Sequence, residues 1–485
     1  MVQLVMVYLF ALHIIATDAA CTSNESSTLN CSHMVTPDIT NDTCLNSSIP
    51  CCDINTYINN SSFKSNTTFC FLNGTHHIDL VDDEILMIRN GFNISLIGLG
   101  GLVQHSLQDK VNEYNFTSYK EDQNVTFFQS STVIRCKRSF AFIFNNINNL
   151  NLLNMAIQNC GANVESMVTP IQGNDSFPNI TSVAFLLISI TNLMFEDISV
   201  QNSTGYGFVG INMFGYSQLI GSSFIGNNQY IKDTNLKSHS YTKNLFCNDG
   251  SCPKNSTIYV TASNDGQTMY PGGNALFIYQ NSTDTSQIQI SSSLFTLGVD
   301  DSISSSIVSG SSYKPLDGIP GTGLSVMMLH STSVNVCITN TVSYRNQAVM
   351  GANFYFQETY ENSVISLFNV NSTRGYSPYN GGAFYYTSYG AASSIAFNGS
   401  IFSSDCSSVI STSVYVKYVG SLQMDNSGIL GQLIAYYTNG IICNSSFQTM
   451  NCNGFMNTFN CNISVTNSTF DGTNVVSNYG NVDVT

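Results

Sequence analysis

Charged residues are scarce in this chain, and basic residues are the scarcest. Only 9% of the 485 residues are Asp, Glu, Lys or Arg, and 15 basic residues against 30 acidic ones give a formal net charge of −15. A nucleic-acid-binding protein needs a basic surface that neutralises phosphates, so we expect no nucleic-acid partner. Solubility must therefore depend mainly on Asn, Ser and Thr side chains and on glycans.

Long hydrophobic runs and helical periodicity are also missing. Beyond the N-terminus no segment offers about 20 consecutive apolar residues, so we expect no membrane span once a leader is removed. Apolar residues still make up 43% of the chain, which is ample for a large core and argues against disorder. They alternate with polar residues at period 2, as strands do, and the Asn, Gly and Ser content weakens any helix.

Residues 1–20 read as a signal peptide. The apolar run Leu4–Leu12 is followed by small residues, including Ala19 and Ala20, that fit a cleavage point. We therefore expect the mature chain to begin near Cys21 and the protein to be secreted and extracellular.

Glycosylation sequons and cysteines point to the same compartment. An Asn- and Ser-rich composition inflates the number of Asn-X-Ser/Thr triplets, but several should carry glycans in a secreted chain. The sites considered are Asn24, Asn46, Asn66, Asn93, Asn179, Asn281, Asn371, Asn444 and Asn467. Fifteen cysteines agree with an oxidising environment. Six of them fall within residues 21–70, which we interpret as a Cys-rich N-terminal cap.

Most disulfide pairings stay open, because connectivity cannot be read from spacing. Cys247 and Cys252 are a local exception. They flank an Asn-Asp-Gly sequence, which favours a tight turn and would bring the two sulfurs together, so we predict a disulfide between them.

A short phrase recurs in the second half of the chain. Two alternating apolar residues lead into a small polar pair and then a large apolar residue, as in Ile395–Phe402, Ile441–Phe447 and Ile463–Phe470. A turn Asn recurs with this phrase about every 18 to 28 residues, which is a repeat length typical of solenoid proteins. These residues are Asn371, Asn398, Asn426, Asn444 and Asn467. A unit of this length cannot bury its own apolar face, so copies must stack.

Coiling one repeat per turn fits these units better than the antiparallel alternatives, a propeller or a sandwich with a regular meander. A propeller blade needs about 40 to 50 residues and four strands, which is longer than the period. In a coil, each strand pairs in parallel with the strand one repeat away, and inward Ile, Val, Leu and Phe form columns. We predict an all-β fold, a right-handed parallel β-helix, over residues 71–485, with loop insertions near 229–273 and 298–323.

The segment Phe69–Gly98 resembles the first coil of eukaryotic right-handed parallel β-helix proteins of the pectin-lyase-like superfamily. It has a Gly-containing turn before His76 and an apolar strand that ends at Gly98. The later Asn-Ser-X-Phe phrases are similar to coil ends of the same family, so the resemblance extends to about Phe470. It implies a fold rather than a function, because these solenoids include lyases, hydrolases and adhesins.

No residue set matches the chemistry of the enzymes in that family. Asp300 and Asp301 form a central acidic pair, but the His-Gly and Arg-X-Lys elements expected beside it in a polygalacturonase are missing. Arg345 and Arg374 lie one repeat apart without a recurring acidic neighbour, and we interpret both as surface charges. We therefore expect no catalytic residues, no metal site and no cofactor.

Tyrosine is abundant, with 25 residues, and many of them fall late in the chain. Aromatic rings on a solenoid face can pack against sugars. The candidate carbohydrate-binding residues are Tyr376, Tyr379, Tyr385, Tyr386 and Tyr389. Inward stacking of some of these rings is the alternative.

Two functions remain at this point. The first is a secreted, non-enzymatic protein for adhesion, matrix or carbohydrate binding, whose partner is an extracellular carbohydrate or a matrix or cell-surface glycoprotein. The second is a diverged polysaccharide lyase or glycoside hydrolase. The lack of a recognisable catalytic set favours the first.

Overall fold

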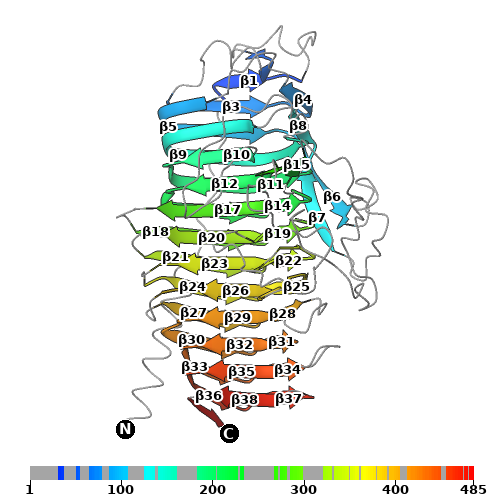
Figure 1. Ribbon diagram of the computed structural model, residues 1–485. Helices are drawn as coiled ribbons and strands as arrows, with labels where there is room; N and C mark the ends of the chain where they lie inside the picture. The colour runs from blue at the N-terminus through cyan, green and yellow to red at the C-terminus, as the bar shows by residue number, and fades with distance from the viewer. Residues whose placement is uncertain are drawn as a thin grey trace, which may run out of the picture.

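The computed structural model of the chain is built from strands that coil around one axis (Figure 1). It describes residues 31–37, 51–54, 65–78, 87–107, 125–136, 140–160, 183–203, 205–227, 230–233, 267–270, 273–280, 285–298, 321–329, 333–348, 350–359, 362–377, 380–389, 393–404, 412–448, 455–472, 474–478 and 480–485. In these ranges no helix has the length and hydrophobicity needed to cross a lipid bilayer.

Each full coil contributes three strands, and each strand pairs in parallel with its counterpart one coil away. The first face contains β10 (Val183–Ile188), β12 (Tyr206–Ile211), β17 (Gly273–Gln280), β20 (Leu324–Leu329), β23 (Phe354–Glu358), β26 (Phe384–Thr387), β29 (Val414–Lys417), β32 (Leu433–Tyr436), β35 (Phe455–Phe459) and β38 (Asn474–Asn478).

The second face contains β13 (Phe214–Ile220), β18 (Ser286–Ser291), β21 (Val334–Thr339), β24 (Val364–Phe368), β27 (Ser394–Asn398), β30 (Ser421–Asp425), β33 (Asn439–Cys443), β36 (Asn462–Thr466) and β39 (Asn481–Val484). The third contains β14 (Ser223–Ile225), β19 (Leu294–Thr296), β22 (Val342–Tyr344), β25 (Asn371–Gly375), β28 (Ile401–Ser404), β31 (Gly428–Leu430), β34 (Ser446–Gln448) and β37 (Thr469–Asp471). The predicted fold class, a right-handed parallel β-helix, is confirmed.

The first coils use longer strands that turn corners without interruption. These are β5 (Met87–Gly98), β9 (Phe140–Gln158) and β11 (Thr191–Gln201), which follow β3 (Thr67–Phe71), β4 (Gly74–Ile78) and β8 (Thr132–Cys136). β9 pairs with β10 along its first part and with β11 along the rest, and because β11 itself pairs with both β13 and β14, β9 spans all three faces. Asn146 and Asn149 bend it, because both adopt the left-handed backbone that Asn tolerates, with φ of 57° and 62°.

The core is a set of inward columns along the axis, as the sequence pattern predicts. Phe397 lies opposite Met424, which lies opposite Ile442, and Ile442 lies opposite Val465. All four side chains are buried in one hydrophobic cluster that runs through the coils. The alternation of apolar and polar residues along each strand therefore builds a continuous apolar interior, because every second side chain points into the coil.

One corner of the coil is made by a column of left-handed residues between the second and third faces. It contains Asn340, Asn369, Gly399, Asn426, Asn444 and Asn467, with φ between 46° and 59°. The predicted turn positions Asn426, Asn444 and Asn467 are confirmed. Those at Asn371 and Asn398 are wrong, because both lie in strands and Asn369 and Gly399 occupy the turn.

The serine that follows the turn residue in the later coils explains the recurring Asn-Ser pair. The backbone amide of Ser400 donates to Ser427 Oγ at 3.1 Å, and that of Ser427 donates to Ser445 Oγ at 3.3 Å. The amide of Ser445 donates in turn to Ser468 Oγ at 3.2 Å. Asn therefore supplies the backbone conformation, and Ser satisfies the amides that the turn would leave unpaired.

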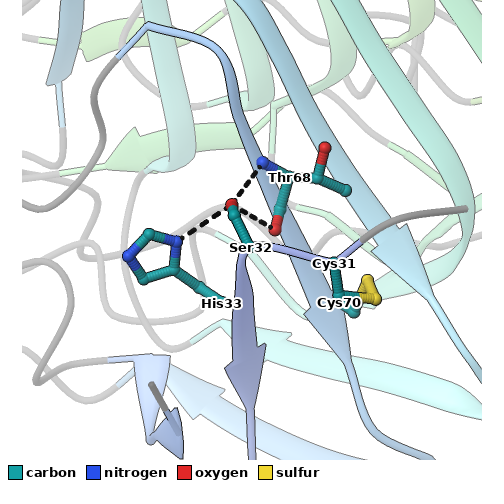
Figure 2. The surroundings of a disulfide bond; sticks show 5 residues. All are labelled: Cys31, Ser32, His33, Thr68 and Cys70. Atoms are coloured by element: carbon teal, nitrogen blue, oxygen red, sulfur yellow. Dashed lines mark hydrogen bonds between the residues drawn. A yellow bond between two sulfur atoms is a disulfide. The ribbon is translucent and has the colours of Figure 1, made fainter. Parts of the chain in front are cut away.

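The N-terminal end of the solenoid is covered by β1 (His33–Val35) and β2 (Cys51–Cys52). β1 pairs in parallel with both β2 and β3, and a disulfide joins Cys31 to Cys70 (Figure 2). Beside it, Ser32 Oγ donates to the carbonyl of Thr68 at 3.0 Å and accepts from its amide at 2.8 Å. Cys51 is also disulfide-bonded.

Among the described residues, two pairs of antiparallel strands lie apart from the coils. One pairs β6 (Leu102–Ser106) with β7 (Thr126–Ser130), and the sequence did not predict it. The other pairs β15 (Tyr230–Asp233) with β16 (Gln267–Tyr270) and lies within the insertion predicted near 229–273. Most of the second predicted insertion, near 298–323, falls outside the described residues, as does the predicted signal peptide.

Candidate functional site

A column of tyrosines runs along the outside of the first face. Tyr355 in β23 lies opposite Tyr385 in β26, which lies opposite Tyr415 in β29. Their ring centroids are 5.3 Å and 5.0 Å apart, and each pair is within 7° of parallel. Tyr355 and Tyr385 pack in a different apolar cluster from their inward-pointing neighbours, which places these rings on the outer surface of the coil.

Exposure increases along this column toward the C-terminal coils. Tyr355 is 1% exposed and Tyr385 is 8% exposed, whereas Tyr415 is half-buried. On earlier coils the same outer layer continues as buried aliphatic side chains, among them Leu186 and Val209. The part of the face that a ligand can reach therefore begins near β29.

From β29 onward the aromatic surface widens. Tyr436, the last residue of β32, lies 5.7 Å from Tyr415 between ring centroids, and it stacks on Phe459 at 4.6 Å and 6°. Tyr418 and Tyr437, one residue beyond the ends of β29 and β32, form a second stack at 4.7 Å and 9°. Two adjacent aromatic stacks thus meet at the end of the first face.

The second stack sits on unusual backbone. Tyr418 and Tyr437 have φ of 58° and 50°, in the left-handed region that costs a residue with a Cβ about 1–2 kcal/mol. Hydrogen bonds between coils hold them, because the Tyr418 amide donates to Tyr436 O at 2.9 Å and the Tyr437 amide donates to Phe459 O at 2.8 Å. Bulky residues in this conformation concentrate at functional sites, which makes this corner a candidate.

Polar groups surround the second stack. Lys417 Nζ lies 5.2 Å from the centre of the Tyr418 ring, a cation–π contact. Asn462 Nδ2 donates to Asn439 Oδ1 at 3.3 Å, and both amides are exposed just past the turn. Tyr437 is 43% exposed. We call Lys417, Tyr418, Tyr437, Asn439 and Asn462 the aromatic corner.

The phenols next to this corner stay protonated at neutral pH. Burial, with smaller contributions from Tyr436 and Tyr418, raises the pKa of Tyr415 to about 12. Burial also raises the pKa of Tyr436. Protonated phenols donate and accept hydrogen bonds, so this surface offers neutral polar groups at the margin of an apolar one.

The predicted tyrosine surface is only partly assembled. Tyr389 is 62% exposed, and Tyr376 is half-buried against the outer apolar cluster that contains Tyr385. Tyr386 points into the core, where it is fully buried, so its assignment to a binding surface is corrected. Its place in β26 explains this, since adjacent strand residues face opposite sides. Tyr379 lies outside the described residues.

Sequence reasoning missed Tyr415, Tyr418, Tyr436 and Tyr437. The signal was present as a tyrosine pattern repeated one coil apart, Tyr-Val-Lys-Tyr at residues 415–418 and Ala-Tyr-Tyr at residues 435–437. Only the strand register, which places Lys417 opposite Tyr436, shows that the tyrosines at the end of one strand stack on those at the end of the next.

Arg345 corrects a second expectation. It is 4% exposed rather than a surface charge, and its Nε donates to the hydroxyl of Tyr344 at 3.1 Å. Arg374, which follows the residue opposite Tyr344 in the next coil, is half-buried. Asp300 and Asp301 fall outside the described residues. Within the described ranges, no group of three or more His, Cys, Asp or Glu side chains is arranged to hold a metal ion.

The predicted glycosylation sites differ in accessibility. Asn66, Asn93, Asn444 and Asn467 are exposed, whereas Asn371 is half-buried in β25 with a buried Oδ1. Several belong to ladders of amides, since Asn93 Nδ2 donates to Asn66 Oδ1 at 2.9 Å and Asn467 Nδ2 donates to Asn444 Oδ1 at 2.6 Å. Asn24, Asn46, Asn179, Asn281, Cys247 and Cys252 lie outside the described residues.

Comparison with known proteins assigns the chain to no family. No protein-family model matches the chain, and no curated protein matches its sequence. Solved structures that share the architecture include the A-module of the mannuronan C-5 epimerase AlgE4 from Azotobacter vinelandii, at 10% identity and a TM-score of 0.35, covering 93% of this chain and 99% of that one.

Two further structures are similar at the same level. The surface protein and adhesin PfbA from Streptococcus pneumoniae is 10% identical with a TM-score of 0.39, covering 89% of this chain and 93% of that one. The pectate lyase Pel9A is 9% identical with a TM-score of 0.32, covering 94% and 82%. Likenesses this distant say nothing about ligand or activity.

Proposed function

We propose that this chain is a secreted glycoprotein, of the eukaryotic type of pectin-lyase-like β-helix, that binds an extracellular polysaccharide through the aromatic corner without cleaving it. The observation that carries the proposal is the Tyr418–Tyr437 stack, in which Tyr437 is exposed and which sits on left-handed backbone beside Lys417 and two exposed amides. Sugars are recognised by this combination of apolar ring surface and convergent polar groups.

The repeat of the solenoid suits a repeating ligand. Successive coils are separated by about 4.8 Å, the spacing of neighbouring strands, which is close to the length of one pyranose unit. A polysaccharide lying along the axis would therefore meet an equivalent position on each coil. Tyr418, Tyr437 and Asn460 occupy such positions, since the amide of Tyr418 bonds to β32 and that of Tyr437 bonds to β35.

Charge favours a neutral polysaccharide over an acidic one. The chain carries a formal net charge of −15, which repels a polyanion at long range. Lys417 is then a hydrogen-bond donor to sugar hydroxyl groups rather than a partner for carboxylates.

Binding of the full secreted protein to immobilised glycans tests the proposal. The panel should contain neutral plant and fungal glucans, xyloglucan, pectin, alginate and glycosaminoglycans. Tyr437→Ala should weaken binding about tenfold, because a lost aromatic contact is worth about 1–1.5 kcal/mol. Tyr389→Ala, which removes an exposed tyrosine outside the corner, is the matched control and should bind as the wild type does.

Two further arms make the result decisive. Asn462 begins a sequon, Asn462-Ile463-Ser464, so binding should also be measured on Ser464→Ala, which removes the sequon and keeps the Asn462 amide in the corner. No binding by either protein to any glycan would overturn the proposal. Release of reducing or unsaturated ends from the same panel would replace it with an enzymatic function.

A further inference from the structure

Cys136 and Cys160 lie at the ends of neighbouring strands in the early coils. Cys136 is the last residue of β8, and Cys160 follows the end of β9 by two residues. β8 and β9 run in parallel with Arg135 opposite Gln158, so the two strands end side by side. The left-handed residue Asn159, with φ of 60°, turns the chain between Gln158 and Cys160.

The two side chains share one buried environment. Both residues are fully buried and belong to the same hydrophobic cluster. Their thiols lie within hydrogen-bonding distance of each other. Two cysteines at the ends of adjacent strands whose thiols are neighbours are placed to form a disulfide, which is impossible when the side chains point apart.

Cys461 shows that burial alone does not create such a pair. It is also buried, but its thiol lies at a turn, where it accepts from the Thr438 amide at 3.4 Å and donates to the carbonyl of Ala435 at 3.4 Å. This is the arrangement that Ser and Thr adopt at neighbouring turns. Cys461 therefore serves as a control, because it is a buried cysteine that makes the hydrogen bonds expected of a Ser or Thr.

We propose that Cys136 and Cys160 form a disulfide in the mature protein, joining the ends of β8 and β9. The Cys31–Cys70 bridge in the preceding coil indicates that the chain folds where such bonds persist. The oxidant is a protein disulfide of the oxidoreductase class. One cysteine thiolate attacks a sulfur of that disulfide to give a mixed disulfide, and the second thiolate then displaces the enzyme. The enzyme leaves with both electrons and both protons, as a dithiol.

The bridge must form before the coils close. Burial raises the pKa of Cys160 well above its usual range, and the neighbouring Cys136 raises it further. A thiol in that state is a poor nucleophile, because exchange requires the thiolate. Oxidation therefore belongs to folding, when both residues are still accessible to the oxidoreductase.

Disulfide mapping of the full secreted chain tests this directly. The unreduced protein is denatured in the presence of an alkylating reagent, digested, and analysed by mass spectrometry. We expect Cys136 and Cys160 in one cross-linked peptide pair without label, and Cys461 fully labelled. Labelling of Cys136 and Cys160 as thiols, or a bridge from either to another cysteine, would overturn the proposal.

A variant supplies an independent measurement. In Cys160→Ser, Cys136 loses its partner and should become fully labelled, whereas Cys461→Ser should leave the Cys136–Cys160 peptide pair unchanged. If Cys160→Ser does not fold, the wild-type map decides alone. The outcome is independent of glycan binding, since the aromatic corner lies on distant coils.

Discussion

The hydroxyl group of Tyr386 donates a hydrogen bond to the carboxyl group of Glu358 inside the β-helix. Glu358 ends β23, and Tyr386 belongs to β26 in the next coil. Ser393 Oγ donates to the same carboxyl group, and the amide of Ser363 donates to its other oxygen at 3.1 Å. Burial raises the pKa of Glu358 in spite of these bonds.

Stability should depend on pH through Glu358. Because its folded-state pKa is raised, its contribution is complete below the ordinary value of 4.5 and is lost as the pH rises through the folded value. Glu358→Gln keeps the shape and removes the titration. Thermal unfolding from pH 4 upward should show the wild type losing stability relative to this variant, and a constant difference would contradict the assignment.

Removing the Tyr386 hydroxyl should destabilise the fold. Tyr386→Phe should cost about 1–3 kcal/mol, the cost of taking one partner from a buried hydrogen-bonding group, measured by denaturant unfolding. Tyr279→Phe is the matched control, because the Tyr279 hydroxyl is buried in β17 and has no hydrogen-bond partner among the described residues. That variant should be neutral or slightly more stable, and equal losses in both would show that ring packing alone is being measured.

A buried ladder of amides should be more sensitive than an exposed one. Asn227 Nδ2 donates to Asn274 Oδ1 at 3.1 Å, Asn274 Nδ2 to Asn346 Oδ1 at 3.0 Å, and Asn346 Nδ2 to Asn353 Oδ1 at 3.0 Å. Asn346→Ala also leaves the amide of Gly298 unpaired, and we expect a loss of about 3 kcal/mol.

The comparison for this ladder is Asn462→Ala, which breaks one exposed bond and should cost less than about 1 kcal/mol. Both values come from denaturant unfolding of the full chain. Similar costs at Asn346 and Asn462 would mean that the buried amides contribute no more than surface ones.

The left-handed corner predicts different effects on stability for two small substitutions. Asn426 has φ of 46°, so Asn426→Ala should cost about 1–2 kcal/mol, whereas Asn426→Gly should be nearly neutral. The measurement is the shift in unfolding midpoint of each variant. A Gly variant that is as unstable as the Ala variant would point to the Asn side chain instead of the backbone.

Glycan occupancy should follow accessibility. Asn444 and Asn467 are exposed at the corner column, so we expect both to be glycosylated in the secreted protein. Asn371, whose Oδ1 is buried in β25, should be unmodified. Peptide N-glycosidase converts a glycosylated Asn to Asp, and mass spectrometry of the digest reads the change at each site.

The sequence predicted the solenoid because its periodicity is local. The phrases at Ile395, Ile441 and Ile463 each contain a strand, a corner and a second strand, so the coil follows from one repeat. The corner residue was misplaced at Asn371 and Asn398, because Asn is common in both strands and turns here. Only the alignment of neighbouring coils distinguishes Asn369 and Gly399 as the turn.

The candidate site could not be predicted in the same way. Inward and outward tyrosines alternate along β26, so Tyr385 and Tyr386 look equivalent until the face of each is known. Whether an outward ring is accessible depends on what covers it. That coverage decreases from Tyr355 to Tyr415, which is a property of the assembled coils.

The Cys31–Cys70 bond holds β1 against β3, and β1 in turn carries β2. Without β1 in place, the backbone N–H and C=O groups along β3 would face solvent as an open template for other strands. The bridge therefore helps to keep the first strand edge of the solenoid covered, and reduction should make that edge more accessible to other strands.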